Sequence, residues 1–384
     1  MQRFICLKVL NFSNCELVTR IPDVSGLPNL EKLSFRDCEK LSKIHESVGF
    51  LDKLRYLDAF HCKNLKTFPP IILTSLKQLN LSHCSTLESF PEILGKMENL
   101  TELRIIGSPI KELPSSIQNL NRLRKLELQI CGMVQLPSSI AMFSQLGLMC
   151  VSRCEGLWLS KQDISEEWET KSSKTEFLIL SYCNLSDDFL PIGLTWFANV
   201  KDLDLSGNNF TILHACIKEC HFLRNLKLDD CVLIREITVI PCKLETLSAK
   251  RCKSLKYIDL TEECQSLREL ILDDCIYLRE IEGVLPNLDH FSAKNCTLLT
   301  SQCASLLVNQ VPLLIPVLFY LINMLSCIHN FMLIIMVFSL QIVDAIMYQA
   351  DWLMECFGIR ENTYITLNGS MLFIGFYHPH SNLL

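Results

Sequence analysis

One twelve-residue pattern recurs along most of the chain and limits what it can fold into. The pattern is L-x-x-L-x-L-x-x-C-x-x-L, and its thirteen first positions are Leu7, Leu30, Leu54, Leu76, Leu100, Leu123, Leu146, Thr175, Val200, Leu223, Leu244, Leu267 and Leu288. These starts are 21 to 25 residues apart, except for one step of 29. A fixed period of this length indicates stacked repeats rather than independent globular domains.

The pattern also predicts the form of each repeat. It has the period of a leucine-rich repeat, in which each unit contributes a short parallel strand and a returning segment. Residues three and five places after each start are apolar, so we expect them to point inward. A single repeat cannot fold alone, because ordering about 23 residues costs roughly 35 kcal/mol while each buried leucine returns about 1.5 to 3 kcal/mol. Repeats must therefore stack.

We predict an α/β fold for residues 1–310, namely a leucine-rich-repeat solenoid of about 13 repeats. The solenoid is expected to be a curved, right-handed coil with a parallel β-sheet on its concave face. A continuous core ladder is expected at Leu33, Leu57, Leu79, Leu103, Leu126, Leu203, Leu226, Leu247 and Leu270.

Cysteine follows the same register. Eleven of the twenty cysteines lie eight residues after a repeat start, at Cys15, Cys38, Cys62, Cys84, Cys131, Cys154, Cys183, Cys231, Cys252, Cys275 and Cys296. Ser108 and Asn208 hold this position in the other two repeats. Such repeats use it to turn the chain out of the strand. No secretory signal precedes the first repeat, so we expect free, packed thiols and a cytoplasmic protein.

The returning segments carry proline after an apolar residue, as at Pro114 and Pro137. His214 replaces this proline in one repeat, where we expect a looser turn. One connection, residues 155–175, is charged and irregular. Two interpretations remain open for it: a solvated loop, or a partner-binding loop that carries Trp158 and Trp168.

The sequence offers little for catalysis or metal binding. The stretch HACIKECH holds His214, Cys216, Cys220 and His221, but alignment with other repeats points these side chains in different directions, so we expect no zinc site. No G-x-S-x-G or H-E-x-x-H motif occurs. The net charge of −6 gives no reason to expect nucleic-acid binding. We predict no enzyme, no catalytic residue, no metal and no cofactor.

Whole stretches of the chain resemble one family of repeat proteins. They are IPDVSGLPNLEKLSF, LNLSHCSTLESFPEILGKMENLTEL, SDDFLPIGLTWFANVKDLDLSGNNF and SAKNCTLLTSQC. With cysteine at the eighth position and I/L-P-x-x-I returns, they are similar to the repeat region of plant intracellular immune receptors with a TIR domain and a nucleotide-binding domain. The resemblance covers about residues 1–310. It implies a scaffold that binds a pathogen effector or a host protein and restrains the nucleotide-binding domain.

The resemblance does not extend to the other receptor domains. No G-x-x-x-x-G-K-[ST] phosphate loop occurs, so ATP binding is not assigned to this chain. Leu7 already belongs to the first repeat, which leaves no room before it for a TIR domain in this sequence. NAD cleavage is therefore not assigned either.

We expect the recognition surface on outward residues of the strands, in two groups. The first group, in repeats two to four, is Lys32, Arg36, Asp37, Tyr56, Asp58, Phe60, His61 and His83. The second, in repeats ten to thirteen, is Asp229, Asp230, Lys250, Arg251, Asp273, Asp274 and Lys294. The second group is an alternating acidic and basic stripe, and two roles remain open for it: partner binding, or neutralisation within the stripe.

The last part of the chain breaks the pattern. Residues 311–343 contain no Lys, Arg, Asp or Glu, and a membrane span needs about 20 apolar residues. Two interpretations remain open: a transmembrane helix, which would place the protein at a membrane, or translated intron sequence. Residues 344–384 carry no repeat and stay unassigned.

Overall fold

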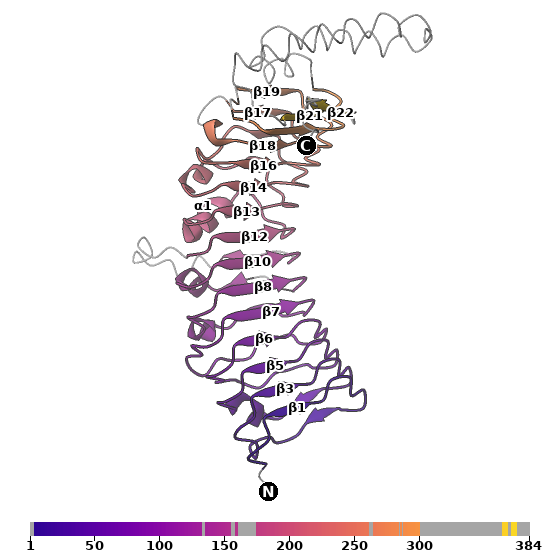
Figure 1. Ribbon diagram of the computed structural model, residues 1–384, viewed down its shortest axis with the longest axis vertical. Coiled ribbons are helices and arrows are strands. Elements are labelled where there is room, and N and C mark those ends of the chain that lie inside the picture. Colours follow the sequence, from indigo (N-terminus) through magenta and orange to yellow (C-terminus); the bar gives the residue numbers. More distant parts are fainter. Residues whose placement is uncertain are drawn as a thin grey trace, which may run out of the picture.

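The computed structural model describes residues 4–132, 135–154, 158–159, 174–260, 264–283, 285, 287–299, 363–367 and 370–374. In this part the chain forms a stack of coils, and one long sheet follows the stack along one side (Figure 1). The first thirteen strands of this sheet pair in parallel with their neighbours in the stack. The predicted parallel-sheet solenoid is therefore confirmed.

The thirteen strands each begin two residues after a predicted repeat start. They are β1 (Val9–Asn11), β3 (Lys32–Ser34), β5 (Tyr56–Asp58), β6 (Gln78–Asn80), β7 (Glu102–Ile106), β8 (Lys125–Gln129), β10 (Leu148–Ser152), β12 (Phe177–Ser181), β13 (Asp202–Asp204), β14 (Asn225–Lys227), β16 (Thr246–Ser248), β18 (Glu269–Ile271) and β20 (His290–Ala293). The pattern thus located every repeat correctly.

The core ladder lies where the pattern put it. Leu33 pairs in register with Leu57, Leu57 with Leu79, and the series continues without a gap to Leu270. Met149 and Leu178 fill the ladder between Leu126 and Leu203. All these side chains are buried. Stacked apolar residues of this kind supply the hydrophobic free energy that one repeat lacks.

The returning segments are mostly 3₁₀ helices and very short strands. The 3₁₀ helices are η1 (Glu46–Phe50), η2 (Ser115–Asn119), η3 (Ser138–Met142), η5 (Leu194–Phe197), η6 (Ala215–Glu219) and η7 (Cys264–Ser266). The short strands form three small parallel sheets: β2 (Arg20–Ile21) with β4 (Lys43–Ile44), β9 (Gln135–Leu136) with β11 (Trp158–Leu159), and β15 (Glu236–Ile237), β17 (Tyr257–Asp259) and β19 (Glu280–Glu282). Within the described residues, α1 (Phe189–Gly193) is the one α-helix.

The turn at His214 is not looser than its equivalents, so that expectation is wrong. His214 has φ −67°, and Pro114 at the same place in another repeat has φ −66°. Both precede a 3₁₀ helix of five residues. His214 Nδ1 accepts a hydrogen bond from the Cys216 backbone N–H at 3.1 Å. The imidazole caps the helix, which stabilises the geometry that proline favours through its ring.

The column of cysteines has a specific structural role. From Cys38 onward, each thiol of the column donates to a carbonyl of the preceding repeat, as from Cys252 Sγ to Leu228 O (3.1 Å) and from Cys275 Sγ to Ala249 O (2.9 Å). Ser108 makes the same contact with Leu81 O at 2.7 Å. The column thus gives buried carbonyls beside the sheet a further donor. Leu228 O, for example, also accepts from the Cys231 N–H at 3.2 Å.

The burial of this column predicts the reactivity of its thiols. Burial raises the pKa of Cys84 to about 11 and that of Cys231 to about 12, and the thiolate is the reactive form. Cys6, Cys15 and Cys242 are exposed. We expect iodoacetamide at pH 8 to label these three in the native protein and to leave Cys84 and Cys231 unmodified until urea is added. Peptide mapping by mass spectrometry checks this, and native labelling of Cys231 as fast as that of Cys242 would contradict it.

Three expectations fall wholly or partly outside the described residues. Of the connection 155–175, the structure describes Trp158–Leu159, which forms β11, and residues 174–175. Residues 311–343 lie outside the residues that the structure describes. Among the described residues, no helix is long and apolar enough to cross a bilayer. In the unassigned tail, β21 (Thr363–Leu367) pairs in parallel with β20, and β22 (Ser370–Ile374) pairs antiparallel with β21.

Candidate functional site

A row of left-handed residues follows the strands and organises the surface next to them. In every repeat the residue seven places after the start has a positive φ, between 51° and 69°. These residues, called the turn row below, are Asn14, Asp37, His61, His83, Gly107, Ile130, Arg153, Tyr182, Gly207, Asp230, Arg251, Asp274 and Asn295. The left-handed turn directs each chain out of the sheet just before the cysteine column.

The fold itself favours only a few residue types in the turn row. Gly, Asn and Asp tolerate a positive φ at small cost, and histidine is also enriched there. Ile130, Arg153 and Tyr182 hold three consecutive places of the row although none belongs to these types. Ile130 is 54% exposed and Tyr182 is 42% exposed, so burial in the core does not explain either residue. Side chains that the backbone disfavours and the core does not need are candidates for a functional role.

The clearest case of strain can be tested by substitution. Ile130 is β-branched and has φ 51°. We expect Ile130→Asn to raise the free energy of unfolding by about 1 kcal/mol, because asparagine adopts this conformation more easily. Urea unfolding of the two proteins measures the difference. A decrease in stability of 1 kcal/mol would show that packing of the isoleucine side chain outweighs the strain.

In the structure, most of the predicted site residues lie outside the strands. Of the fifteen, only Lys32, Tyr56 and Asp58 lie within a strand. The other twelve lie in the turn row or one residue before it, so their predicted placement on strands is wrong. The physical reason is that β3, β5, β6, β14, β16 and β18 are three residues long and end before the left-handed turn. The residues still form a surface, but it lies beside the sheet rather than on it.

The first predicted group is brought together around Phe60. The Arg36 guanidinium lies over the Phe60 ring at 4.0 Å from its centroid. The His83 ring packs edge-on against Phe60, with 5.1 Å between ring centroids. His61 Nδ1 lies 2.9 Å from Asp37 Oδ1. Aromatic, cationic and acidic groups thus share one part of the surface, which is a mixture enriched at protein interfaces.

Lys32 and Tyr56 stand apart from this cluster. They pair in register at the start of β3 and β5, four residues before Arg36 and Phe60. Tyr56 is 45% exposed. Asp58 connects the two areas, because it accepts the Phe60 N–H at 3.0 Å and lies 3.5 Å from Arg36 Nη1.

The second predicted group is largely occupied with internal contacts. Asp229 Oδ1 accepts hydrogen bonds from Ser248 Oγ and the Lys250 N–H, at 2.6 and 2.8 Å. Asp273 does the same one repeat later, with Ser292 Oγ and the Lys294 N–H at 2.5 and 2.9 Å. These two carboxylates hold the next turn in place. Asp274 accepts from Asn295 Nδ2 at 2.7 Å.

The expected stripe of cross-strand ion pairs therefore contains one such pair among the described residues. Arg251 donates from Nε and Nη2 to the two carboxylate oxygens of Asp230, at 2.7 and 2.8 Å. These hydrogen bonds from Arg251 hold the pKa of Asp230 below its ordinary value. Both partners belong to the turn row.

This pair continues into residues that the sequence analysis missed. Tyr182 Oη donates to Asp230 Oδ2 at 2.5 Å, and the Arg153 guanidinium lies 5.7 Å from the centre of the Tyr182 ring. A Cβ atom at Gly207 would lie 2.2 Å from this ring, so glycine is required for Tyr182 to cross that repeat. Arg153, Tyr182, Asp230 and Arg251 form one chain of contacts, called the Tyr182 network below.

Within the described residues, the group nearest to a catalytic arrangement has the wrong geometry. His45 Nδ1 lies 2.9 Å from Ser47 Oγ and 3.8 Å from Asp23 Oδ1. The same nitrogen accepts the Ser47 N–H at 3.2 Å. A serine triad needs the acid and the nucleophile on opposite ring nitrogens. His45 instead caps η1.

The HACIKECH residues have separate structural roles. Cys220 is buried in the core, Cys216 is half-buried, and His214 caps η6. His221 is mostly exposed and lies 3.8 Å from Glu219. Across the part of the chain that the structure describes, no group of three or more His, Cys, Asp or Glu residues is arranged to hold a metal ion.

Comparison with known protein families identifies the family of these repeats. Residues 72–278 match a family model described as disease resistance protein RPS4B-like, leucine-rich repeats. The chain belongs to this family. The resemblance stated from the sequence is thereby confirmed: these are repeats of plant resistance proteins of the class with TIR and nucleotide-binding domains.

The curated relatives are disease resistance proteins. TMV resistance protein N of Nicotiana glutinosa is 32% identical over 298 residues, which cover 66% of this chain and 26% of that protein. Disease resistance protein RPS4B of Arabidopsis thaliana is 29% identical over 254 residues, covering 66% of this chain and 18% of that one. The chain thus spans about a quarter or less of the length of these relatives.

Among solved structures, the leucine-rich-repeat domain of the type III effector XopL is similar in fold. It has 22% sequence identity and a TM-score of 0.47, and the match covers 58% of this chain and 75% of that domain.

Proposed function

We propose that this chain is the ligand-sensing repeat region of a plant immune receptor and that it binds a protein partner through the turn row. The observation that carries the proposal is the run of Ile130, Arg153 and Tyr182, three exposed large side chains at consecutive left-handed positions. Tyrosine and arginine are the residue types most often responsible for binding energy at interfaces.

The Tyr182 network gives this surface a fixed shape before a partner binds. Tyr182 is held by Asp230 on one side and by Arg153 on the other, and Asp230 is held in turn by Arg251. An aromatic side chain that is already ordered loses little conformational entropy on binding. Arg36, Phe60 and His83, which lie in or next to the turn row farther toward the N-terminus, provide a second contact area of similar chemistry.

The proposed partner is a pathogen effector or a host protein that the receptor monitors. We also propose that the repeats restrain a nucleotide-binding domain, as in the family. This domain is either part of the same protein or a separate partner. A cytoplasmic location belongs to the same proposal. The alternative function is that of a membrane-anchored repeat protein, and it depends on residues 311–343.

A pull-down from plant extract with matched variants tests the proposal. Tyr182→Asn keeps a residue suited to positive φ but removes the ring, and Tyr277→Asn is the control because Tyr277 is 50% exposed and lies outside the turn row. For the proteins that the unmodified chain captures, we expect the captured amount to fall at least tenfold with Tyr182→Asn. With Tyr277→Asn we expect the captured amount to stay the same. The same capture by all three chains would contradict a binding role for Tyr182.

A further inference from the structure

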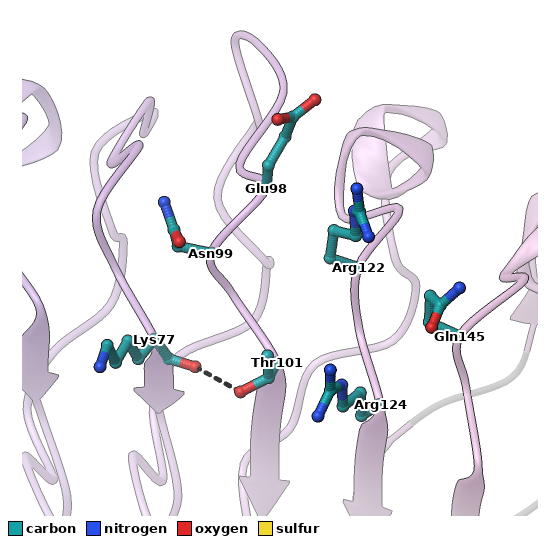
Figure 2. A pocket seen from close by; sticks show the side chains of 7 residues that line it. All are labelled: Lys77, Glu98, Asn99, Thr101, Arg122, Arg124 and Gln145. Carbon is teal, nitrogen blue, oxygen red and sulfur yellow. Dashed lines mark hydrogen bonds between the residues drawn. The ribbon is translucent and has the colours of Figure 1, made fainter.

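A basic hollow opens at the other end of the strands, away from the turn row. It is lined by Lys77, Glu98, Asn99, Thr101, Arg122, Arg124 and Gln145 and has a volume of about 560 Å³ (Figure 2). This volume is within the range of about 300 to 1,000 Å³ that small-ligand sites occupy. Three of its residues are cations and one is an acid.

Among the residues that the structure describes, these three cations have no acidic partner. Within the described part of the chain, no carboxylate lies within 4.0 Å of the charged nitrogens of Lys77, Arg122 or Arg124, whereas Arg104 and Lys125 on the strands nearby both contact Glu127. Glu98 extends from the loop at the far side of the hollow and does not point toward Lys77 or Arg124 (Figure 2). The hollow therefore concentrates positive charge.

Lys77 and Arg124 lie in a row of residues that ion pairs neutralise only in part. The residue one place after a repeat start forms an ion pair with the neighbouring repeat in four cases: Lys8 with Glu31 (2.9 Å), Lys201 with Glu176 (2.9 Å), Arg224 with Glu245 (3.3 Å) and Arg268 with Asp289 (3.6 Å). Among the described residues of this row, Arg55 has no carboxylate within 4.0 Å either. In the middle, Thr101 and Gly147 occupy places in this row where an acid could pair with Lys77 and Arg124. The smaller side chains also leave the space that forms the hollow.

The backbone beneath the hollow is fixed by hydrogen bonds. Lys77 O accepts from Thr101 N at 3.0 Å, Thr101 O accepts from Arg124 N at 2.9 Å, and Arg124 O accepts from Gly147 N at 3.0 Å. Thr101 Oγ1 also donates to Lys77 O at 3.3 Å (Figure 2). The side chains of Lys77 and Arg124 thus start from a hydrogen-bonded backbone. Within the described residues, neither side chain donates a hydrogen bond to another protein group, so their donors are available to a ligand.

We propose that this hollow binds a small anion that carries at least two phosphate groups. The guanidinium groups of Arg122 and Arg124 provide planar, bidentate donors for phosphate oxygens. The Lys77 side chain extends away from Arg124 in Figure 2, so its ammonium group supplies a point charge at the edge of the hollow. Lys77 and Arg124 are two repeats apart, or about 10 Å along the sheet at the usual strand spacing. An anion with two phosphate groups can therefore contact both with less movement of the two side chains than a single phosphate requires. This site is independent of the protein-binding surface proposed above.

Isothermal titration of the full chain with inorganic pyrophosphate at a fixed salt concentration of about 0.15 M tests the proposal. We expect saturable binding that Arg124→Gln weakens about tenfold. Arg224→Gln is the matched control, because Arg224 holds the same place in its repeat but is paired with Glu245. It should leave pyrophosphate binding unchanged. Lys77→Gln provides a second variant of the hollow, so a folding defect in one variant does not leave the question open.

Three results would overturn the proposal. The first is no binding of pyrophosphate to the folded chain. The second is the same loss with Arg224→Gln as with Arg124→Gln, which would indicate diffuse attraction to the surface. The third is binding of a hexa-aspartate peptide without binding of pyrophosphate, which would show that the hollow receives an acidic segment of a protein instead.

Discussion

Replacing Asn208 by alanine is expected to lower the free energy of unfolding by about 3 to 5 kcal/mol. The Asn208 side chain is 1% exposed and replaces cysteine in its column. Its Oδ1 accepts the backbone N–H groups of Cys183 and Leu185, both at 3.1 Å. Its Nδ2 donates to the carbonyls of Leu180 and Leu205, both at 2.7 Å. Alanine would leave four buried backbone groups without this partner, and each such loss costs about 1 kcal/mol or more.

Two further variants make this prediction specific. Asn208→Cys should lose less than alanine, because a thiol can still donate to Leu180 O as its equivalents do in other repeats. Asn209→Ala changes an exposed residue and should alter stability by no more than about 0.5 kcal/mol. Urea unfolding followed by circular dichroism measures all three. Equal stability of the Asn208→Ala and Asn209→Ala proteins would refute the role given to this column.

Leu103→Ala is expected to destabilise the protein by about 3 kcal/mol, within the range of 2 to 5 kcal/mol that cavities of this kind cost. Leu103 is fully buried in β7, and its neighbours in the ladder are Leu79 and Leu126 on either side. Leu10 occupies the same place in β1, where it is only partly buried. Leu10→Ala should therefore cost about 1 kcal/mol. The same unfolding experiment compares the pair, and a larger loss at Leu10 would contradict the continuous core.

The repeats and their core could be predicted because they depend on local periodicity. Alternation of apolar residues determines which face of a strand is buried, and the period determines which residues stack, so Leu33 and Leu270 could be placed without coordinates. The column of cysteines followed from the same register. The returning segments were harder, since 3₁₀ helices of five residues leave no helical periodicity to detect.

The candidate site was predicted only in part, because it depends on backbone conformation. The recurrence of Asn14, Asp37, Gly107 and Asp230 at one place in the repeat was a signal for positive φ, and it would have revealed the turn row. The contact between Tyr182 and Asp230 could not be found in this way. It joins residues 48 positions apart, skips a whole repeat and depends on the absence of a side chain at Gly207.

Site-specific photo-crosslinking tests the central claim, partner recognition on the turn row, most directly. A photoreactive phenylalanine derivative is placed at position 182 in one protein and at position 277 in another, and both are irradiated in plant extract. Both native residues are exposed tyrosines, so labelling chemistry and accessibility are matched. We predict a discrete protein adduct from position 182 and none from position 277. Adducts from position 277 alone, or the same adducts from both positions, would contradict recognition on the turn row.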